Sequence, residues 1–277
     1  MDAPVDRLRV LTLNVWARQG DWDARRSLIV RGLRELQPDL VAFQEPVKTD
    51  DYDQAADLVG PGFHVVHQTV PAHGSSDHIG TVIASRWPVA EVHELDLHLT
   101  PRTRDFPCAT LAAEVHVPRP IGPLLFINHL PSWQRDFEHE RQLQSVAAAR
   151  FIEEIVGSRQ IHVVLAGDLD ATPDAASIRF WTGRQALDGM SVCYEDAWEL
   201  AHPGGGGETM SPRNPLRGDP GRPAEPGRRI DYILVRRPGI GPTLAVTTCE
   251  LAFGEPRDGT WASDHFGVVS DLAIVAP

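Results

Sequence analysis

Short apolar runs rich in β-branched residues recur along the whole chain and predict a protein built mainly of strands. Runs of this kind, separated by turn-forming residues, are typical of buried or half-buried strands. We expect about ten strands, at residues 9–15, 39–45, 63–69, 81–85, 110–117, 124–130, 162–166, 230–235, 243–251 and 267–274.

Helical periodicity is clear in only two segments, 25–37 and 138–156, where apolar residues recur every three or four positions. The repeating positions are Ile29, Leu33 and Leu36 in the first segment and Leu143, Ala147, Phe151 and Ile155 in the second. We expect these positions to form the buried face of each helix. The pattern as a whole predicts a strand-rich α/β (α+β) fold in which helices cover two packed sheets.

The chain is 277 residues long and shows no internal repeat and no linker that divides it, so we expect one domain over 1–277. The one long irregular segment is 202–229, which contains Gly204 to Gly207 and six prolines and cannot form a regular element. Long loops are usually functional or disordered. Because this one leads directly into the 230–235 strand, we interpret it as the rim of an active site, with a flexible surface insertion as the alternative.

Composition and charge narrow the class of protein. The net charge is −12, which disfavours a non-specific nucleic-acid binder because such proteins carry a basic surface that neutralises phosphates. No apolar run approaches the roughly 20 residues of a membrane-spanning helix, and 10–14 is too short for a signal-peptide core, so we expect a cytoplasmic protein. Cys108, Cys193 and Cys249 lack a disulfide or zinc-site spacing and are expected to be buried free thiols.

Polar side chains stand where several of the predicted strands end. Asn14 and Glu45 end the first two strands, Asp168 and Asp170 follow 162–166, and Asp264-His265 precedes the last strand. Any one of these residues alone would be explained as a turn cap or a surface ion pair. Together they supply oxygen donors and imidazole without cysteine, which points to Mg²⁺ or Mn²⁺ rather than zinc. A divalent ion beside an activated water is typical of phosphoester chemistry.

With these residues in view, the chain resembles the endonuclease/exonuclease/phosphatase superfamily, whose members include DNase I, abasic-site endonucleases, inositol phosphatases and neutral sphingomyelinases. The matching motifs occur in order: LNVW with Asn14, FQE with Glu45, SRWPV at 85–89, NHLP with His129, GDLD with Asp168, RIDYIL with Asp231, and SDHFG with Asp264 and His265. The resemblance implies a DNase I-like four-layer sandwich, two packed β-sheets flanked by helices.

The resemblance also implies roles for the site residues. Glu45 would be the principal metal ligand with Asn14 beside it, and Asp264 would support the metal or orient the groups around it. Asp168 would position and deprotonate the attacking water. His265, oriented by Asp231, would act as base or bind the phosphate. His129 would stabilise the phosphate or protonate the leaving oxygen.

Asp170 departs from the family pattern, in which an Asn occupies this position and donates a hydrogen bond. A carboxylate donates only when it is protonated. Asp170 therefore either binds a second metal ion or is held protonated, and a neutral variation within a subgroup is a third possibility. If residues 168–170 stay extended, both carboxylates project to the same side, and we favour the second metal ion on that ground.

These observations predict a divalent-metal-dependent phosphoesterase that acts on a small phosphorylated metabolite or a lipid head group. A DNA nuclease is the alternative, and the acidic balance makes DNA the less favoured partner. A non-catalytic binding module is a minor alternative, because Glu45, Asp168 and His265 are all present. Several arginines could bind a phosphate group of the substrate, or could equally be solvated charges of loops. They are Arg102, Arg104, Arg213, Arg217, Arg228 and Arg229.

Overall fold

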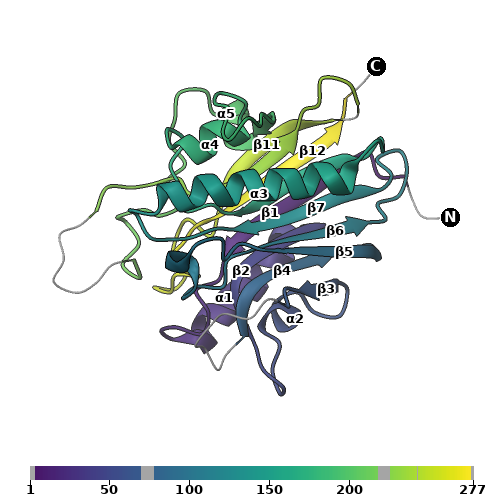
Figure 1. Ribbon diagram of the computed structural model, residues 1–277. Coiled ribbons are helices and arrows are strands. Elements are labelled where there is room, and N and C mark those ends of the chain that lie inside the picture. The colour runs from purple at the N-terminus through teal and green to yellow at the C-terminus, as the bar shows by residue number, and fades with distance from the viewer. Residues whose placement is uncertain (1–3, 70–77, 218–224, 242, 276–277) are drawn as a thin grey trace.

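The computed structural model describes residues 4–69, 78–217, 225–241 and 243–275, which fold into two six-stranded sheets (Figure 1). The first sheet has the order β11-β12-β1-β2-β4-β3. Its strands are β1 (Arg7–Asn14), β2 (Leu40–Lys48), β3 (His64–His67), β4 (His78–Ser85), β11 (Leu244–Ala252) and β12 (Gly267–Ile274). Only β1 and β2 pair in parallel, which brings the carboxyl ends of these two strands to one edge.

The second sheet has the order β5-β6-β7-β8-β10-β9. Its strands are β5 (Val89–Asp96), β6 (Ala109–Val115), β7 (Leu124–Leu130), β8 (His162–Asp168), β9 (Tyr194–Asp196) and β10 (Asp231–Arg236). In this sheet β7 and β8 are the parallel pair, and β10 runs antiparallel to β8. The last residue of β8, Asp168, therefore lies opposite the first residue of β10, Asp231.

Helices cover the outer face of each sheet, so the predicted four-layer sandwich is confirmed. On the first sheet lie α1 (Trp22–Leu36) and α2 (Gln54–Val59), and on the second lie α3 (Glu138–Val156) and α4 (Ala176–Trp181). The short α5 (Ala197–Ala201) follows β9, and the 3₁₀ turn η1 (Pro101–Thr103) precedes β6. The apolar side chains form three clusters, one between the sheets and one under each helical layer.

A polar contact crosses the apolar layer between the sheets close to the strand ends. The Gln44 Nε2 atom donates to Asn128 Oδ1 at 2.8 Å, and the Asn128 amide nitrogen donates to the carbonyl oxygens of Phe43 and Val82. Buried polar groups of this kind favour one relative placement of their partners because any other placement leaves a donor or acceptor unsatisfied. The sheets are thus held in register near the edge where Asn14 and Asp168 end their strands.

The structure corrects several expectations of detail. The strands β5 and β9 and the helices α2, α4 and α5 have no counterpart among the predicted segments. The second helix has the predicted bounds, but Leu143 is exposed and the buried stripe runs through Gln144, Ala148 and Ile152. Gln144 turns inward because its amide bonds the backbone of Leu97 and Ser132. Of the three free thiols, Cys108 and Cys249 are buried but Cys193 is exposed.

No helix among the described residues is both long and apolar enough to span a membrane.

Candidate active site

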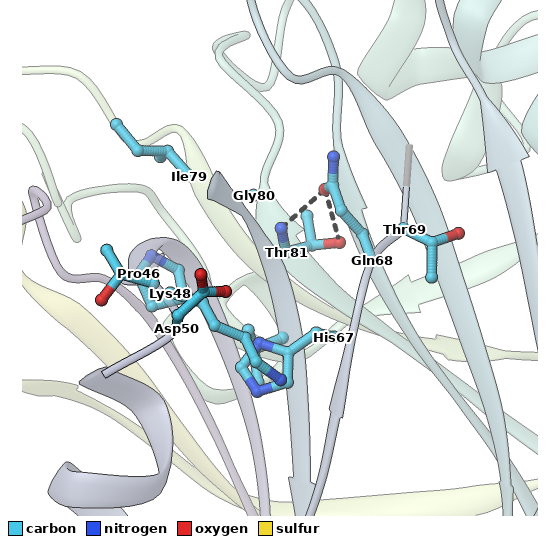
Figure 2. Close-up of a pocket in the computed structure, with 11 residues that line it drawn as sticks. Pro46, Lys48, Asp50, His67, Gln68, Thr69, Ile79, Gly80 and Thr81 are labelled. Carbon is cyan, nitrogen blue, oxygen red and sulfur yellow. Dashed lines mark hydrogen bonds between the residues drawn. The ribbon is translucent and has the colours of Figure 1, made fainter. Parts of the chain in front are cut away.

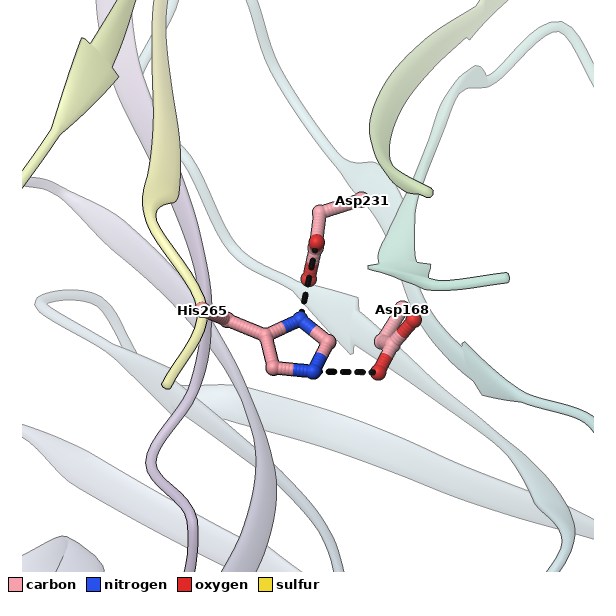
Figure 3. A group of neighbouring side chains, drawn as sticks. All are labelled: Asp168, Asp231 and His265. Carbon is pink, nitrogen blue, oxygen red and sulfur yellow. Dashed lines mark hydrogen bonds and ion pairs between the residues drawn. The ribbon is translucent and has the colours of Figure 1, made fainter. Parts of the chain in front are cut away.

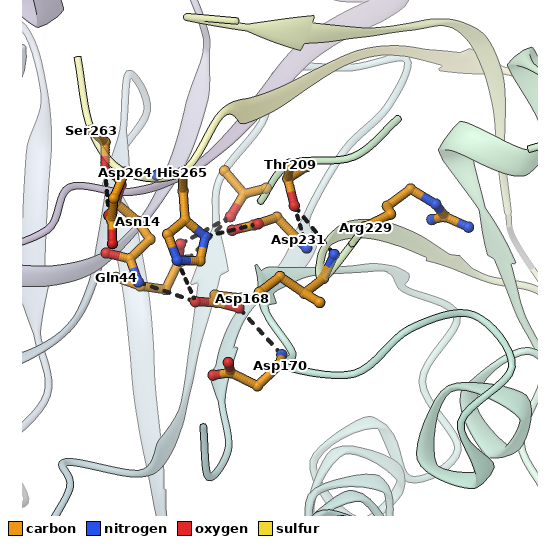
Figure 4. Close-up of polar contacts among 12 residues, drawn as sticks. Asn14, Gln44, Asp168, Asp170, Thr209, Arg229, Asp231, Ser263, Asp264 and His265 are labelled. Carbon is orange, nitrogen blue, oxygen red and sulfur yellow. Dashed lines mark hydrogen bonds and ion pairs between the residues drawn. The ribbon is translucent and has the colours of Figure 1, made fainter. Parts of the chain in front are cut away.

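The strand topology brings the predicted residues from the two sheets to one edge of the sandwich (Figure 4). Asn14 ends β1 and Glu45 lies in the neighbouring parallel strand β2. Asp168 and Asp231 face each other in the second sheet. Because β12 runs antiparallel to β1, the Asp264-His265 pair that precedes it lies beside the end of β1, and Ser263 Oγ donates to the Asn14 carbonyl at 2.7 Å.

Asn14 links the two sheets through its side-chain amide. The Nδ2 atom donates to Glu45 Oε1 at 3.0 Å and to Asp168 Oδ2 at 3.0 Å, while Oδ1 accepts from the backbone N–H of Trp16 at 2.9 Å. A backbone N–H can only donate, so this contact fixes which end of the amide faces the carboxylates. In this arrangement the Asn14 atom that faces Glu45 and Asp168 is a donor, and a metal-ligand role for Asn14 stays a prediction.

His265 lies between two aspartates of the second sheet (Figure 3). Its Nδ1 is 3.0 Å from Asp231 Oδ2 and its Nε2 is 3.7 Å from Asp168 Oδ2, and all three side chains are buried. One ligand atom from each of the three lies within 4.8 Å of the others. Burial alone lowers the pKa of His265, but the carboxylates of Asp231, Asp168 and Asp264 outweigh it and hold the pKa well above its ordinary value.

Glu45 sits where β2 deviates from regular pairing. The register with β4 shifts between Gln44 and Val47, and Glu45 has a left-handed backbone with φ of 60°. A non-glycine residue in this conformation costs free energy and is typical of functional sites. The conformation accompanies a carboxyl group that accepts from Asn14. Burial and then the charge of Asp264 raise the pKa of Glu45.

Negative charge exceeds positive charge among the predicted site residues. Burial is the main cause that raises the pKa of Asp168 and of Asp264, and Asp170 and Asp231 add to the effect at Asp168. Against these carboxyl groups and Glu45 stands a single imidazole, His265. Buried carboxylates that are not paired are stabilised by a cation or by protonation, so this set of oxygen donors fits a divalent cation.

Asp170 lies outside the extended strand, contrary to the expectation for 168–170. β8 ends at Asp168, and Asp170 has a left-handed backbone with φ of 51° while its N–H donates to Asp168 Oδ1 at 3.2 Å. The argument that both carboxylates project to the same side of one strand is therefore wrong. Burial raises the pKa of Asp170 to about 7, so a substantial fraction of this carboxyl group is protonated at neutral pH.

His129 is buried on the helical side of the second sheet, away from the Asp168 cluster. Its Nδ1 is 2.8 Å from Thr110 Oγ1, and its ring makes an edge contact with Trp181 at 5.7 Å between centroids. Side chains alternate along a strand, and the preceding Asn128 occupies the layer between the sheets. Burial lowers the pKa of His129 to about 3. The described residues contain no hydrogen bond between His129 and another predicted site residue.

Gly167 explains part of the GDLD motif. A Cβ atom at this position would collide with the backbone carbonyl of His129 on the neighbouring strand β7. Glycine thus allows the two parallel strands to approach closely where Asp168 emerges.

Residues of the 202–229 loop support the site, and the sequence analysis missed them. The Thr209 hydroxyl oxygen accepts from the N–H groups of Ile230 and Asp231 at 3.2 and 3.3 Å, and its carbonyl accepts from Phe266 at 2.7 Å. Asn214 Nδ2 donates to the carbonyl oxygens of Ser263 and Asp264. Thr209 and Asn214 of the loop therefore contact both segments that carry the Asp231–His265 pair, and the interpretation of the loop as a rim stays a prediction. Threonine and asparagine are ordinary loop residues, so no pattern in the chain indicated either role.

A cavity of about 340 Å³ begins one residue beyond Glu45, at Pro46 (Figure 2). Lys48 and Asp50 lie on one side of it, and Gln68 and Thr69 lie on the other. The cavity has the size of a site for a small molecule, and its lining is mixed, with one lysine and one aspartate.

Comparisons with known proteins agree with the fold and the motifs. The profile of the endonuclease/exonuclease/phosphatase family matches residues 11–265, so the chain belongs to this family of enzymes that hydrolyse phosphoester bonds. No curated protein matches the chain.

Solved structures with the same fold are distant in sequence. TDP2 of D. rerio, complexed with single-strand DNA product, superposes with a TM-score of 0.75 at 20% identity, over 97% of this chain and 99% of that one. The human Nocturnin catalytic domain with bound sulfate gives 0.73 at 16% identity, over 99% and 97%. An endonuclease/exonuclease/phosphatase of Beutenbergia cavernae gives 0.68 at 23% identity, over 98% and 72%.

Proposed function

We propose that the protein is a divalent-metal-dependent phosphoesterase in which water attacks phosphorus in line with the leaving oxygen. The observation that carries the proposal is the meeting of carboxyl groups from two sheets, Glu45 and Asp264 from the first and Asp168 and Asp231 from the second, around one imidazole. Glu45 and Asp264 would hold one Mg²⁺ or Mn²⁺ ion. Such an ion stabilises charge on phosphoryl oxygens and lowers the pKa of bound water.

Side chains of the protein would activate the water and bind the phosphate. Asp168 is positioned by the Asn14 amide and the Asp170 N–H, and its raised pKa suits it to accept the proton of the attacking water. His265, held protonated by Asp231 and its neighbours, would bind the phosphate that is attacked. The new bond joins the water oxygen to phosphorus as the bond from phosphorus to the leaving oxygen breaks.

His129 and Asp170 receive narrower roles than the family resemblance implies. With a pKa of about 3, His129 is neutral near pH 7 and a poor acid for the leaving oxygen, so we assign it the positioning of the β7 and β8 ends. We assign Asp170 the role of a protonated donor toward the phosphate, which needs one metal ion rather than two. The raised pKa of Asp170 supports this assignment.

We propose a small phosphorylated metabolite or a lipid head group as the substrate. The net charge of −12 opposes the tracking of a polyanionic strand, and the cavity of about 340 Å³ that begins at Pro46, the residue after Glu45, has the size of a small-molecule site. A DNA nuclease is the second candidate, which the likeness to the DNA-bound D. rerio TDP2 fold favours.

A hydrolysis screen tests the proposal. The protein would be assayed with Mg²⁺ and with Mn²⁺ on p-nitrophenyl phosphate, bis-p-nitrophenyl phosphate, sugar phosphates, sphingomyelin, plain DNA and abasic DNA. We expect metal-dependent release of phosphate or alcohol from small substrates at a higher rate than nicking of either DNA. Absence of hydrolysis in every arm would overturn the proposal, and faster nicking of DNA would promote the nuclease.

A further inference from the structure

Arg228 lies at the entrance to the cluster of Asp168, Asp170 and Asp231. It stands three residues before Asp231, in a segment that runs beside the end of β8, because the Leu169 N–H donates to the Ile230 carbonyl at 2.8 Å. The backbone of Arg228 is fixed by a bridge to Met210 across the loop. Its side chain interacts electrostatically with the carboxylates of Asp170 and Asp168, so it lies near the proposed phosphate position.

Other arginines near this edge already have partners. The donors of Arg25 bond the carbonyl oxygens of Val15, Gln19 and Ala262. Arg141 bonds Glu138 and three carbonyl oxygens of the segment after β7, and Arg229 pairs with Asp196 at 2.7 Å. These groups stabilise the fold and have few donors left for a substrate.

Arg228 differs from them. In the part of the chain that the structure describes, no carboxylate forms an ion pair with Arg228, and its buried Nε has no hydrogen-bond partner. A buried donor without a partner costs free energy, and in native proteins such an atom is commonly explained by function. The unused donor of Arg228 thus points to a ligand that would accept from it.

Two further arginines add positive charge to the same place. Arg135 and Arg217 share one carboxylate, Glu225, which pairs with both. Among the described residues, Arg135 and Arg217 thus have one carboxylate between them, and the charges of both act on Arg228. The pKa of Arg228 is lowered, first by burial and then by the charge of Arg135, whereas Asp170 and Asp168 raise it. Within the described residues, positive charge thus exceeds negative charge around Glu225, and Arg228 also interacts electrostatically with Asp170 and Asp168.

We infer that Arg228, assisted by Arg135, binds a second phosphate group of the substrate next to the phosphate that is cleaved. This inference rests on the proposed function and specifies its substrate class: a molecule that carries two phosphates. A guanidinium group donates two parallel hydrogen bonds to phosphate and remains charged at all physiological pH values. The second phosphate belongs either to a small bisphosphorylated molecule or to the neighbouring position of a short nucleotide chain.

Calorimetric binding in the presence of excess Mg²⁺ tests the inference without relying on turnover. The probes are straight-chain alkyl bisphosphonates with spacers of one, three and five carbons, each matched to the monophosphonate of the same chain length. We expect at least one bisphosphonate to bind the native protein about 10- to 100-fold more tightly than its partner, as charge-assisted hydrogen bonds permit. Arg228→Gln should remove this advantage and Arg228→Lys should keep part of it.

Two controls complete the design. Arg150→Gln removes an exposed arginine of α3 that pairs with Asp188, and it should leave the advantage of the bisphosphonate intact. Thymidine dinucleotides with and without a 5′-phosphate distinguish the sources, because a larger Arg228-dependent gain in this pair would assign the second phosphate to a nucleotide chain.

The inference is overturned if no bisphosphonate or phosphorylated dinucleotide binds more tightly than its matched probe. It is also overturned if Arg228→Gln has the same unfolding temperature as the native protein and still binds the bisphosphonate more tightly than the monophosphonate. Failure of the proposed function has a different signature, namely no hydrolysis of any phosphoester in the screen described above.

Discussion

Replacing Asp170 by asparagine should stabilise the metal-free protein above neutral pH. The carboxyl group of Asp170 is buried, and burial raises its pKa from an ordinary 3.8 to about 7. Between these pH values the folded protein holds a proton that the unfolded chain has lost, so stability falls as pH rises through this window. With 1.36 kcal/mol for each pKa unit, the loss at pH 8 approaches about 4 kcal/mol as an upper limit. Asparagine carries no charge and escapes this loss.

The assay is urea denaturation in EDTA at pH 4.5 and pH 8 for the native protein and Asp170→Asn. We expect the variant to be the more stable protein at pH 8, with the difference shrinking toward pH 4.5. Asp174→Asn serves as the matched control from the same loop. Its carboxyl group donates nothing, accepts from the Thr172 hydroxyl and has a lowered pKa, so its removal should reduce stability at pH 8.

Two results would refute this reasoning. A stability difference that does not grow with pH would mean that the Asp170 carboxyl group is not destabilised by burial. A second, metal-dependent phase in the rate of the native enzyme that disappears in Asp170→Asn would restore the two-ion alternative. We expect single-site metal curves and similar rates for both proteins.

The remaining predictions address the other parts of the site. Glu45→Gln should weaken the affinity for Mg²⁺ or Mn²⁺ and reduce a rate that excess metal partly restores, and EDTA should abolish the activity of the native protein. Identical metal titrations for the variant and the native protein would show that Glu45 is not a ligand. Asp231→Asn should lower the pKa of His265, because the opposite charge that raises it is lost, and should lower kcat about 10²- to 10⁴-fold. Both effects are read by proton NMR titration and kinetics, with Asp96→Asn, at an exposed aspartate that pairs with His98, as the control that keeps the rate. Thr209→Val should cost about 1–3 kcal/mol of stability because two buried N–H groups lose their acceptor, whereas Thr209→Ser should keep the stability. Equal denaturation midpoints for Thr209→Val and the native protein would contradict this prediction. Duplex DNA should be a poor substrate, and tight, salt-dependent binding with rapid nicking would contradict the charge argument.

The convergence of Asn14, Asp168 and His265 could be predicted because each lies at or next to the end of an apolar strand. Asn14 and Asp168 are terminal residues of β1 and β8, and the parallel and antiparallel pairings carry them to one edge. The side of the sheet that His129 occupies could not be predicted in the same way. Every residue of β7 is buried, so its pattern does not distinguish the face between the sheets from the face under the helices.

The elements that were missed share a physical cause. β5 is largely exposed and polar, and β9 has three residues, so neither shows the apolar run of a buried strand. α2, α4 and α5 have six residues or fewer, too few for a helical repeat to be recognised. The predicted face of α3 is displaced because Gln144 satisfies backbone groups inside the protein, a contact that depends on loops distant in the sequence.

The candidate site lies at the contact between the two sheets, and each sheet supplies only some of its residues. In the proposed function the first sheet supplies the metal ligand Glu45 and the imidazole of His265, and the second sheet supplies Asp168 and Asp231; Asn14 and His265 contact the opposite sheet. Catalytic geometry tolerates errors of only about 0.5 Å. The distance between the two sheets is set by buried apolar side chains such as Ile83 and Phe126. This distance therefore determines how accurately the catalytic groups of the two sheets meet. Substitution of these buried apolar side chains can therefore change the rate of turnover while every polar residue of the site stays the same.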